Sequence, residues 1–244
     1  MSIFKQIINQ ICGIFYMAFR YDGKFPNKDN FHCAEPYSLP FEGTWAVING
    51  GIEEATSHSW DIATQRYAYD FVILDNEGKS FSGEGLELTD FYCYGKDILA
   101  PADGVVVEVL NECPESGIAL DGKIKNNSKD IRGNYLLVKH TDSEFSLLAH
   151  LKPGSILVSV GDTVKRGQKV AQCGNTGNST EPHLHLHLQN GRSFYCSPGL
   201  PISFEKINVQ SFGDSDEVTQ SLSLYPPYIT KGQQVENLTC ENTP

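Results

Sequence analysis

One stretch decides how this chain folds: Gly174-Asn-Thr-Gly-Asn-Ser-Thr-Glu-Pro-His183-Leu-His185-Leu-His187. A glycine-rich loop leads into a run in which histidine and leucine alternate, as in a strand whose successive side chains point to opposite faces. The histidines are therefore expected on one face, and the leucines in the core behind them. Imidazole nitrogens are good zinc ligands, so the pattern indicates a metal site. A polar strand face exposed to solvent is the alternative at this point.

Short runs rich in Val, Tyr and Leu surround this strand between about residues 44 and 204, and Gly, Pro and Asn separate them. Such runs, bounded by turn residues, predict β-strands. The expected strands are Thr44–Asn49, Tyr67–Leu74, Gly104–Leu110, Asn134–His140, Phe145–His150, Lys169–Gln172 and Leu184–Gln189. Long helical periodicity is absent here. We therefore predict a mainly β fold, a flattened β-sandwich or open barrel of mostly antiparallel strands.

The composition changes on either side of this region, and we predict three parts: an N-terminal extension (1–44), a main domain (45–204) and a C-terminal tail (205–244). A short, buried amphipathic helix is expected in the extension. Apolar residues recur there at helical spacing, at Phe4, Ile7, Ile8, Ile11 and Phe15. The last part is polar, which indicates a loosely attached tail.

Composition and charge limit the classes of function. The apolar run Ile11–Phe19 is too short to span a bilayer and makes a poor secretion signal. We expect no transmembrane segment, and the location stays open between the cytoplasm and non-classical export. The formal net charge of −11 argues against a nucleic-acid partner, which needs a basic face. Seven cysteines without a Cys-x-x-Cys pair indicate free thiols, and we expect a monomer with one sizeable core.

Several motifs occur in the order found in lysostaphin-type zinc peptidases. The glycine-rich loop and the His-Leu-His strand resemble the last of these motifs, and Ala149-His150-Leu151-Lys152-Pro153-Gly154 resembles the one upstream. Ala100–Gly104 and Gly133–Tyr135 also fit, so the resemblance covers about residues 55–190. It implies the flattened sandwich that these peptidases share with biotinyl carriers and the glucose-type phosphotransfer domain. A phosphotransfer role is a minor alternative.

The resemblance also implies a zinc ion (Zn²⁺) and a set of site residues. Such enzymes hold zinc with a His and an Asp near the start of the domain and with the second His of the His-x-His pair, which is His185 here. Asp70 is the best match for the Asp, and His150 and His183 would flank the metal and act in catalysis. The implied activity is zinc-dependent endopeptidase cleavage of peptide or peptidoglycan, in stem peptides or cross-bridges.

The first zinc ligand departs from the common pattern. A His is expected four residues before the Asp, and that position holds Arg66, which cannot bind zinc. His58 is the nearest candidate, provided that the intervening loop folds it back to the metal. Asp61 and His187 are lesser substitutes. If none of them serves, the site is degenerate, and the chain would be a binding or regulatory module on the same scaffold.

Asp70 lies in an otherwise apolar run, where burying a carboxylate is costly unless it pairs or binds a metal. An ion-pair or capping role is the alternative to metal binding. The resemblance places Tyr135 in the cleft as a hydrogen-bond donor. Cys173 is expected to pack in the interior, and neither His32 nor His140 has a context that suggests a role.

Overall fold

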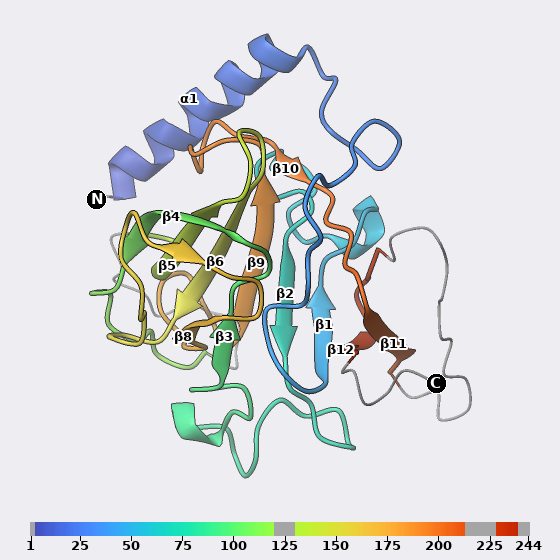
Figure 1. Cartoon of the computed structure of the whole chain (residues 1–244). Coiled ribbons are helices and arrows are strands. Elements are labelled where there is room, and N and C mark those ends of the chain that lie inside the picture. The colour runs from blue at the N-terminus through green and yellow to red at the C-terminus, as the bar shows by residue number, and fades with distance from the viewer. Residues whose placement is uncertain (1–2, 120–129, 213–227, 239–244) are drawn as a thin grey trace.

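The computed structural model describes residues 3–119, 130–212 and 228–238, and it shows a mostly β protein with one long helix (Figure 1). The helix α1 spans Ile3–Tyr21, and two short 3₁₀ helices span Glu54–Thr56 and Leu88–Asp90. The strands are β1 (Trp45–Asn49), β2 (Tyr69–Val72), β3 (Asp97–Leu99), β4 (Gly104–Leu110), β5 (Asn134–Lys139), β6 (Phe145–Leu151), β7 (Thr163–Val164), β8 (Lys169–Gln172), β9 (Leu184–Gln189), β10 (Gly199–Leu200), β11 (Ile207–Ser211) and β12 (Gln233–Asn237).

One large antiparallel sheet forms the body of the molecule. Its strands follow the order β11-β12-β1-β2-β9-β6-β5-β4-β7, and β10 pairs with β9 off this path. The strands β3 and β8 form a separate two-stranded sheet. The prediction of a mainly β, antiparallel fold is confirmed, and each of the seven expected strands occurs within two residues of its predicted bounds.

The main hydrophobic core joins the large sheet to the β3–β8 pair, for example through Ile98 and Val170. It takes in all the leucines of β9, which are Leu184, Leu186 and Leu188. A second, smaller cluster includes Phe194, whose ring centroid lies 5.9 Å from that of His187. Strand β9 therefore presents leucines to the main core and histidines to the opposite face, as its alternation predicts.

The C-terminal segment differs from the loosely attached tail that its composition suggests. Strand β12 pairs with β1, where Trp45 lies opposite Val235, and β11 pairs with β12 along its whole length. A strand ladder is built from backbone hydrogen bonds, which polar side chains do not prevent. Polar composition is therefore a poor sign of loose attachment here, and Val235 supplies a buried contact. The domain boundaries at 44 and 204 stay a prediction.

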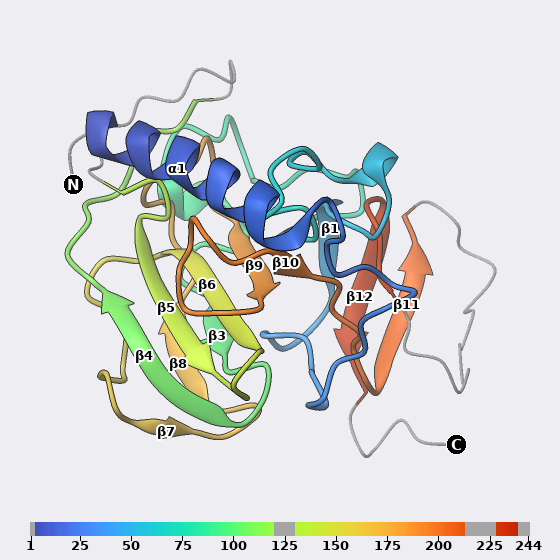
Figure 2. The same cartoon turned by 90° about the horizontal axis from the view of Figure 1, so that it is seen from above.

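Helix α1 occurs where the sequence predicts it, but its apolar side is not buried. Phe15 and Phe19 are 72% and 92% exposed, whereas Met17 is 2% exposed. The helix lies along the outside of the molecule (Figures 1 and 2). The prediction of a buried helix was wrong because periodicity shows that one side is apolar, not which side faces the body. No helix in the described part of the chain is long and apolar enough to cross a membrane.

Candidate functional site

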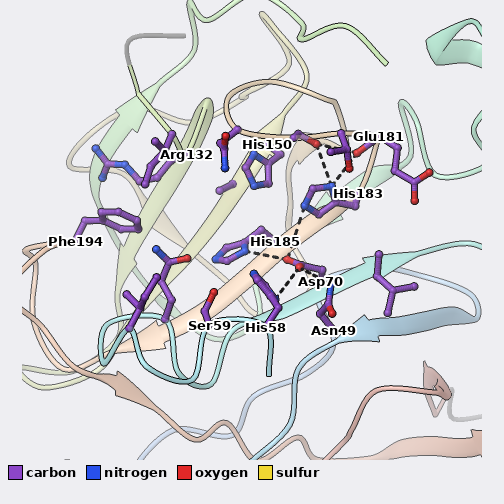
Figure 3. Close-up of a pocket in the computed structure, with 18 residues that line it drawn as sticks. Asn49, His58, Ser59, Asp70, Arg132, His150, Glu181, His183, His185 and Phe194 are labelled. Atoms are coloured by element: carbon purple, nitrogen blue, oxygen red, sulfur yellow. Dashed lines mark hydrogen bonds and ion pairs between the residues drawn. The ribbon is translucent and has the colours of Figure 1, made fainter. Parts of the chain in front are cut away.

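A pocket of about 390 Å³ brings together all five residues that the sequence predicts as ligands or catalysts (Figure 3). They are His58, Asp70, His150, His183 and His185. Figure 3 shows these side chains directed toward a common region around Asp70. The predicted set is therefore compact in space, although its members are spread over more than half of the sequence.

Strand pairing and one unusual backbone conformation bring four of these side chains together. Asp70 on β2 is the direct cross-strand partner of His185 on β9, and His185 lies opposite Ala149 on β6. His150 follows Ala149, and His183 immediately precedes β9. Direct cross-strand partners have Cβ atoms about 4.5–5.5 Å apart, so the pairing of β2 with β9 brings Asp70 and His185 together. Strand alternation alone would point His150 away from Ala149, and the left-handed backbone of His150 (φ 61°) departs from that regular pattern.

Asp70 is the centre of this polar cluster and is almost fully buried. His185 Nδ1 lies 3.0 Å from Asp70 Oδ1, and His58 Nδ1 lies 3.5 Å from Asp70 Oδ2. Asn49, its partner on β1, donates from Nδ2 to Oδ2 at 3.3 Å. Burial raises the pKa of the Asp70 carboxyl, but a hydrogen bond from His185, formed when Nδ1 of that ring carries a proton, and the nearby histidine charges outweigh it and lower that pKa well below its ordinary value. The carboxylate is therefore ionised and suited to a cation.

Hydrogen bonds within the loop before β2 hold its two ends together, and this loop carries His58 in the pocket wall. Ser57 Oγ donates to Arg66 O at 2.8 Å, and Arg66 Nε donates to Trp60 O at 2.9 Å. The Arg66 guanidinium also lies over the rings of Trp60 and Phe25, 5.0 and 5.4 Å from their centroids. The arginine that stands where the resemblance expects a histidine therefore holds together the loop that carries His58.

The lesser candidates for a first ligand lie elsewhere. Asp61 is not among the residues that line the pocket. His187 is fully buried behind His185, and the two rings are joined by a hydrogen bond from nitrogen to nitrogen of 2.9 Å. Neither residue approaches Asp70 as His58 does, so His58 stays the preferred candidate.

Two imidazoles line the pocket with their tautomers set by the backbone. His150 Nδ1 donates to Thr176 O at 2.8 Å, and His183 Nδ1 donates to Glu181 O at 2.8 Å. Each neutral ring therefore keeps a lone pair on Nε2. Burial, followed by the charges of His183 and His185, lowers the pKa of His150 well below its ordinary value, which favours the neutral, proton-accepting form. The two ring centroids lie 4.6 Å apart.

The backbone of His150 is also unusual. Its φ is 61°, in the left-handed region that side chains other than glycine seldom adopt. The backbone N–H of His150 donates to Arg132 O at 3.0 Å, which helps to hold this conformation at the end of β6. Such conformations carry strain and tend to occur at functional positions, where the surroundings impose them.

A chain of hydrogen bonds runs behind His185 along β9. Gln189 Nε2 donates to Gly191 O at 2.6 Å, so Gln189 Oε1 is left to accept from His187 Nε2 at 2.9 Å. Burial lowers the pKa of His187 to about 3, so this ring is neutral and its Nδ1 carries a lone pair. That lone pair accepts from His185 Nε2 at 2.9 Å. The proton of a neutral His185 is therefore on Nε2.

The consequence appears on the other side of the His185 ring. With its proton on Nε2, His185 Nδ1 carries a lone pair, and this lone pair faces the Asp70 carboxylate at 3.0 Å. Two buried acceptors at this distance repel each other unless a cation joins them. A proton or a metal ion can supply the missing charge.

Two distances around Asp70 are close to those between the ligands of a zinc ion. Zinc takes nitrogen and oxygen ligands at about 2.0–2.2 Å in a tetrahedron, which puts neighbouring donors about 3.4 Å apart. The His185 and His58 nitrogens lie 3.0 and 3.5 Å from oxygens of Asp70. Within residues 3–119, 130–212 and 228–238, no group of three or more His, Cys, Asp or Glu side chains lies in an arrangement that could hold a metal ion. The assignment of the three residues as ligands stays a prediction, which rests on the spacing of these donor atoms.

Asn49 and Arg132 are two of the polar pocket residues that were not predicted from the sequence. Asn49 ends β1, and only the pairing of β1 with β2 brings it to Asp70. Arg132 lies in the pocket wall, with Nε and Nη2 2.9 and 2.7 Å from the two oxygens of Asp130. Arg132 directly precedes the Gly133-Asn-Tyr motif, and a charged residue at that position was the signal that could have identified it. Asn49 gave no such signal, because it resembles an ordinary turn residue.

Three other sequence predictions can be compared with the structure. Tyr135 does not line the pocket, because Arg132 covers its ring at 3.7 Å and its hydroxyl donates to Glu108 at 3.3 Å. Cys173 is fully buried, as predicted. His140 contacts Asp103 O and Ser146 Oγ, both at 2.7 Å, and has a structural role away from the pocket.

Residues 85–195 match the model of Peptidase family M23. The chain is 31% identical over 122 residues to Peptidoglycan DD-endopeptidase ShyA of Vibrio cholerae, covering 50% of this chain and 22% of that protein. It is 33% identical over 136 residues to Murein hydrolase activator NlpD of Salmonella dublin, covering 55% and 30% of the two chains. The matched stretch thus spans less than a third of either curated relative.

Among solved structures, the catalytic domain of lysostaphin from Staphylococcus simulans aligns at 20% identity and a TM-score of 0.37, covering 65% of this chain and 88% of that one. The family match includes His150, His183 and His185. His58 and Asp70 lie before it.

Proposed function

We propose that the chain, whose residues 85–195 match the model of Peptidase family M23, is a zinc-dependent endopeptidase acting on peptidoglycan. In this proposal His58, Asp70 and His185 are the zinc ligands, and His150 and His183 are the catalytic pair. The substrates are peptide bonds of stem peptides or cross-bridges. The similarity to a named peptidoglycan endopeptidase supports this substrate class.

The observation that carries the proposal is the lone pair of His185 Nδ1 beside the Asp70 carboxylate. A proton alone would make an imidazolium–carboxylate pair from these two groups. A third donor, His58 Nδ1, lies 3.5 Å from the same carboxylate, and its own pKa is lowered by burial. One proton cannot serve three acceptors, whereas a divalent cation can, and two nitrogens with one oxygen are a donor set that suits zinc.

In the proposed reaction, the metal and the side chains of the protein have separate roles. When bound, a zinc ion supplies Lewis acidity to a peptide carbonyl and lowers the pKa of a water molecule toward about 7. His150 and His183 each line the pocket with an Nε2 lone pair, so either ring is able to take a proton from the attacking water. The same ring then returns the proton to the leaving amine. Thr176 O and Glu181 O keep the two rings in the required tautomer.

Zinc content and hydrolysis of purified peptidoglycan test the proposal. The full chain is expected to purify with one bound zinc and to release new amino groups from peptidoglycan. A chelator should abolish the release, and added zinc should restore it. His140→Ala is a matched control, because it removes a histidine outside the pocket and should change neither result. A protein that binds no zinc with all five side chains intact contradicts the proposal.

A binding or regulatory module is the second candidate. Two observations favour it: Arg66 stands at the usual ligand position, and the chain is also similar to a murein hydrolase activator. This alternative predicts retention on peptidoglycan without any release of amino groups, with or without added zinc. Release that depends on zinc and on His150 excludes it.

A further inference from the structure

The N-terminal helix presents its apolar side to solvent. The exposed side chains are Ile8, Ile11, Ile14, Phe15, Tyr16 and Phe19, which we call the α1 apolar face. The helix has 19 residues, about 28 Å in length, and these positions recur along most of it. Within the described parts of the chain, no other segment covers this face. A contiguous exposed surface of large apolar residues marks an interaction site.

The body of the protein holds α1 by the opposite side. Gly13 lies so close to the backbone of Tyr195 that a Cβ would come within 2.0 Å of Tyr195 O. Gln6 Oε1 accepts from the backbone N–H of Ile131 at 3.2 Å. Asn190 Nδ2 donates to the Tyr21 hydroxyl at 2.6 Å. These groups and the buried Met17 attach the helix to the body, and the exposed side chains of the α1 apolar face lie on its other side. Figure 2 shows the helix lying along the outside of the strands.

The charge distribution points to the partner. Helix α1 contains Lys5 and Arg20 and no acidic residue, and the next residues add Lys24 and Lys28 against Asp22 and Asp29, so residues 1–29 have a net charge of +2. The whole chain carries −11, which leaves −13 on the remaining residues. Basic residues that flank an amphipathic helix favour an anionic lipid surface, each contributing about 1 kcal/mol near the headgroups. A second copy would bring the same basic flank, so like charges would face each other.

We propose that the α1 apolar face binds an anionic membrane surface, with the helix lying in the plane of the interface. The apolar side chains enter the boundary between headgroups and acyl chains, and Lys24 and Lys28 lie beside the headgroups. Phe15, Tyr16 and Phe19 suit this depth because aromatic rings favour the interface. The helix itself is not apolar enough to span the membrane, which agrees with binding in the plane.

Membrane binding through α1 would also bring the pocket close to the membrane. Ile131, which donates to Gln6 of the helix, lines the pocket, and so does Phe194, the neighbour of Tyr195. The segments that attach α1 are therefore part of one pocket wall. This inference does not depend on the proposed activity, because binding is measured without catalysis.

Vesicle sedimentation tests the inference on the full chain. The probes are vesicles of phosphatidylcholine with phosphatidylglycerol, and vesicles of phosphatidylcholine alone. Wild type is expected to sediment with the mixed vesicles, and less with the neutral ones. Phe15→Ser with Phe19→Ser should weaken binding at least about tenfold, because two exposed phenylalanines no longer insert. Lys24→Glu with Lys28→Glu should remove the preference for the anionic vesicles.

Leu157→Ser with Val160→Ser is the matched control, since both residues are exposed apolar side chains outside α1. This variant is expected to bind as wild type does. Equal binding by the Phe15 and Phe19 variant overturns the proposal, and so does a wild type that sediments with neither vesicle. Self-association that the same double variant abolishes, without vesicle binding, would instead identify a second copy as the partner. Phe15 and Phe19 are exposed, so unchanged melting temperatures should confirm that the variants fold.

Discussion

The pocket has two halves that are built in different ways. One half holds His150, His183 and His185 on and beside the paired strands β6 and β9, inside the stretch that matches the peptidase family. The other half holds Asp70 on β2 and His58 on the preceding loop, outside that stretch. Strand pairing and hydrogen bonds to neighbouring segments position the first half. The second half depends on a closed loop, so we expect it to be the more easily disturbed.

The largest expected effect compares one ligand from each half. His185→Ala should abolish zinc binding and lower kcat/KM by about 10³-fold or more, because the Lewis acid is lost. His58→Ala should also remove zinc if the loop half completes the ligand set. Metal analysis after dialysis and peptidoglycan hydrolysis measure both variants. Unchanged zinc affinity in His58→Ala would mean that Asp70 is the only zinc ligand in the second half of the pocket.

The next effect separates catalysis from metal binding within the strand half. His150→Gln should lower kcat by about 10²-fold or more while zinc content stays that of wild type, since a general base contributes this much and glutamine is not basic. His183→Gln should do the same if the proton passes through that ring instead. A variant of either residue that loses zinc as well would show that it binds the metal.

The difference between the two halves also explains what the sequence could predict. Alternation in residues 183–188 shows directly which side chains share a face, and the burial of Leu184, Leu186 and Leu188 agrees with it. Asp70 was matched through the family resemblance, and its place in an otherwise apolar strand, where a carboxylate needs a partner, supported that match. These signals depend on residues that are close together in the sequence, so they do not require knowledge of the rest of the fold.

The features that sequence reasoning missed depend on partners distant in the chain. Asn49 reaches Asp70 through the pairing of β1 with β2. Strand β12 forms by pairing with β1, which lies almost two hundred residues earlier in the sequence. The outward orientation of α1 depends on the close approach of Gly13 to Tyr195. Composition and periodicity carry no information about such pairings.

A smaller effect tests the hydrogen-bond chain that supports the strand half from behind. His187→Ala should weaken zinc binding about 10- to 100-fold, because the partner that holds His185 Nε2–H is lost and the ring can turn or change tautomer. His140→Ala again serves as the control, since its ring contacts Asp103 and Ser146 outside the pocket. Competition with a chromogenic chelator measures the affinity. Equal zinc affinities for wild type and His187→Ala would mean that strand register alone orients His185.

The smallest effect concerns the loop half and the arginine that closes it. Arg66→Lys keeps the positive charge but removes the Nε donor that bonds Trp60 O at 2.9 Å, and it weakens the stacking on Trp60 and Phe25. The lost hydrogen bond is worth about 0.5–1.5 kcal/mol, which converts to between about two- and tenfold weaker zinc binding through a less ordered His58. Arg192→Lys is the control, because its guanidinium bonds Glu108 on the surface. If Arg66→Lys binds zinc like wild type while His58→Ala does not, the loop is held by Ser57 and its packing alone.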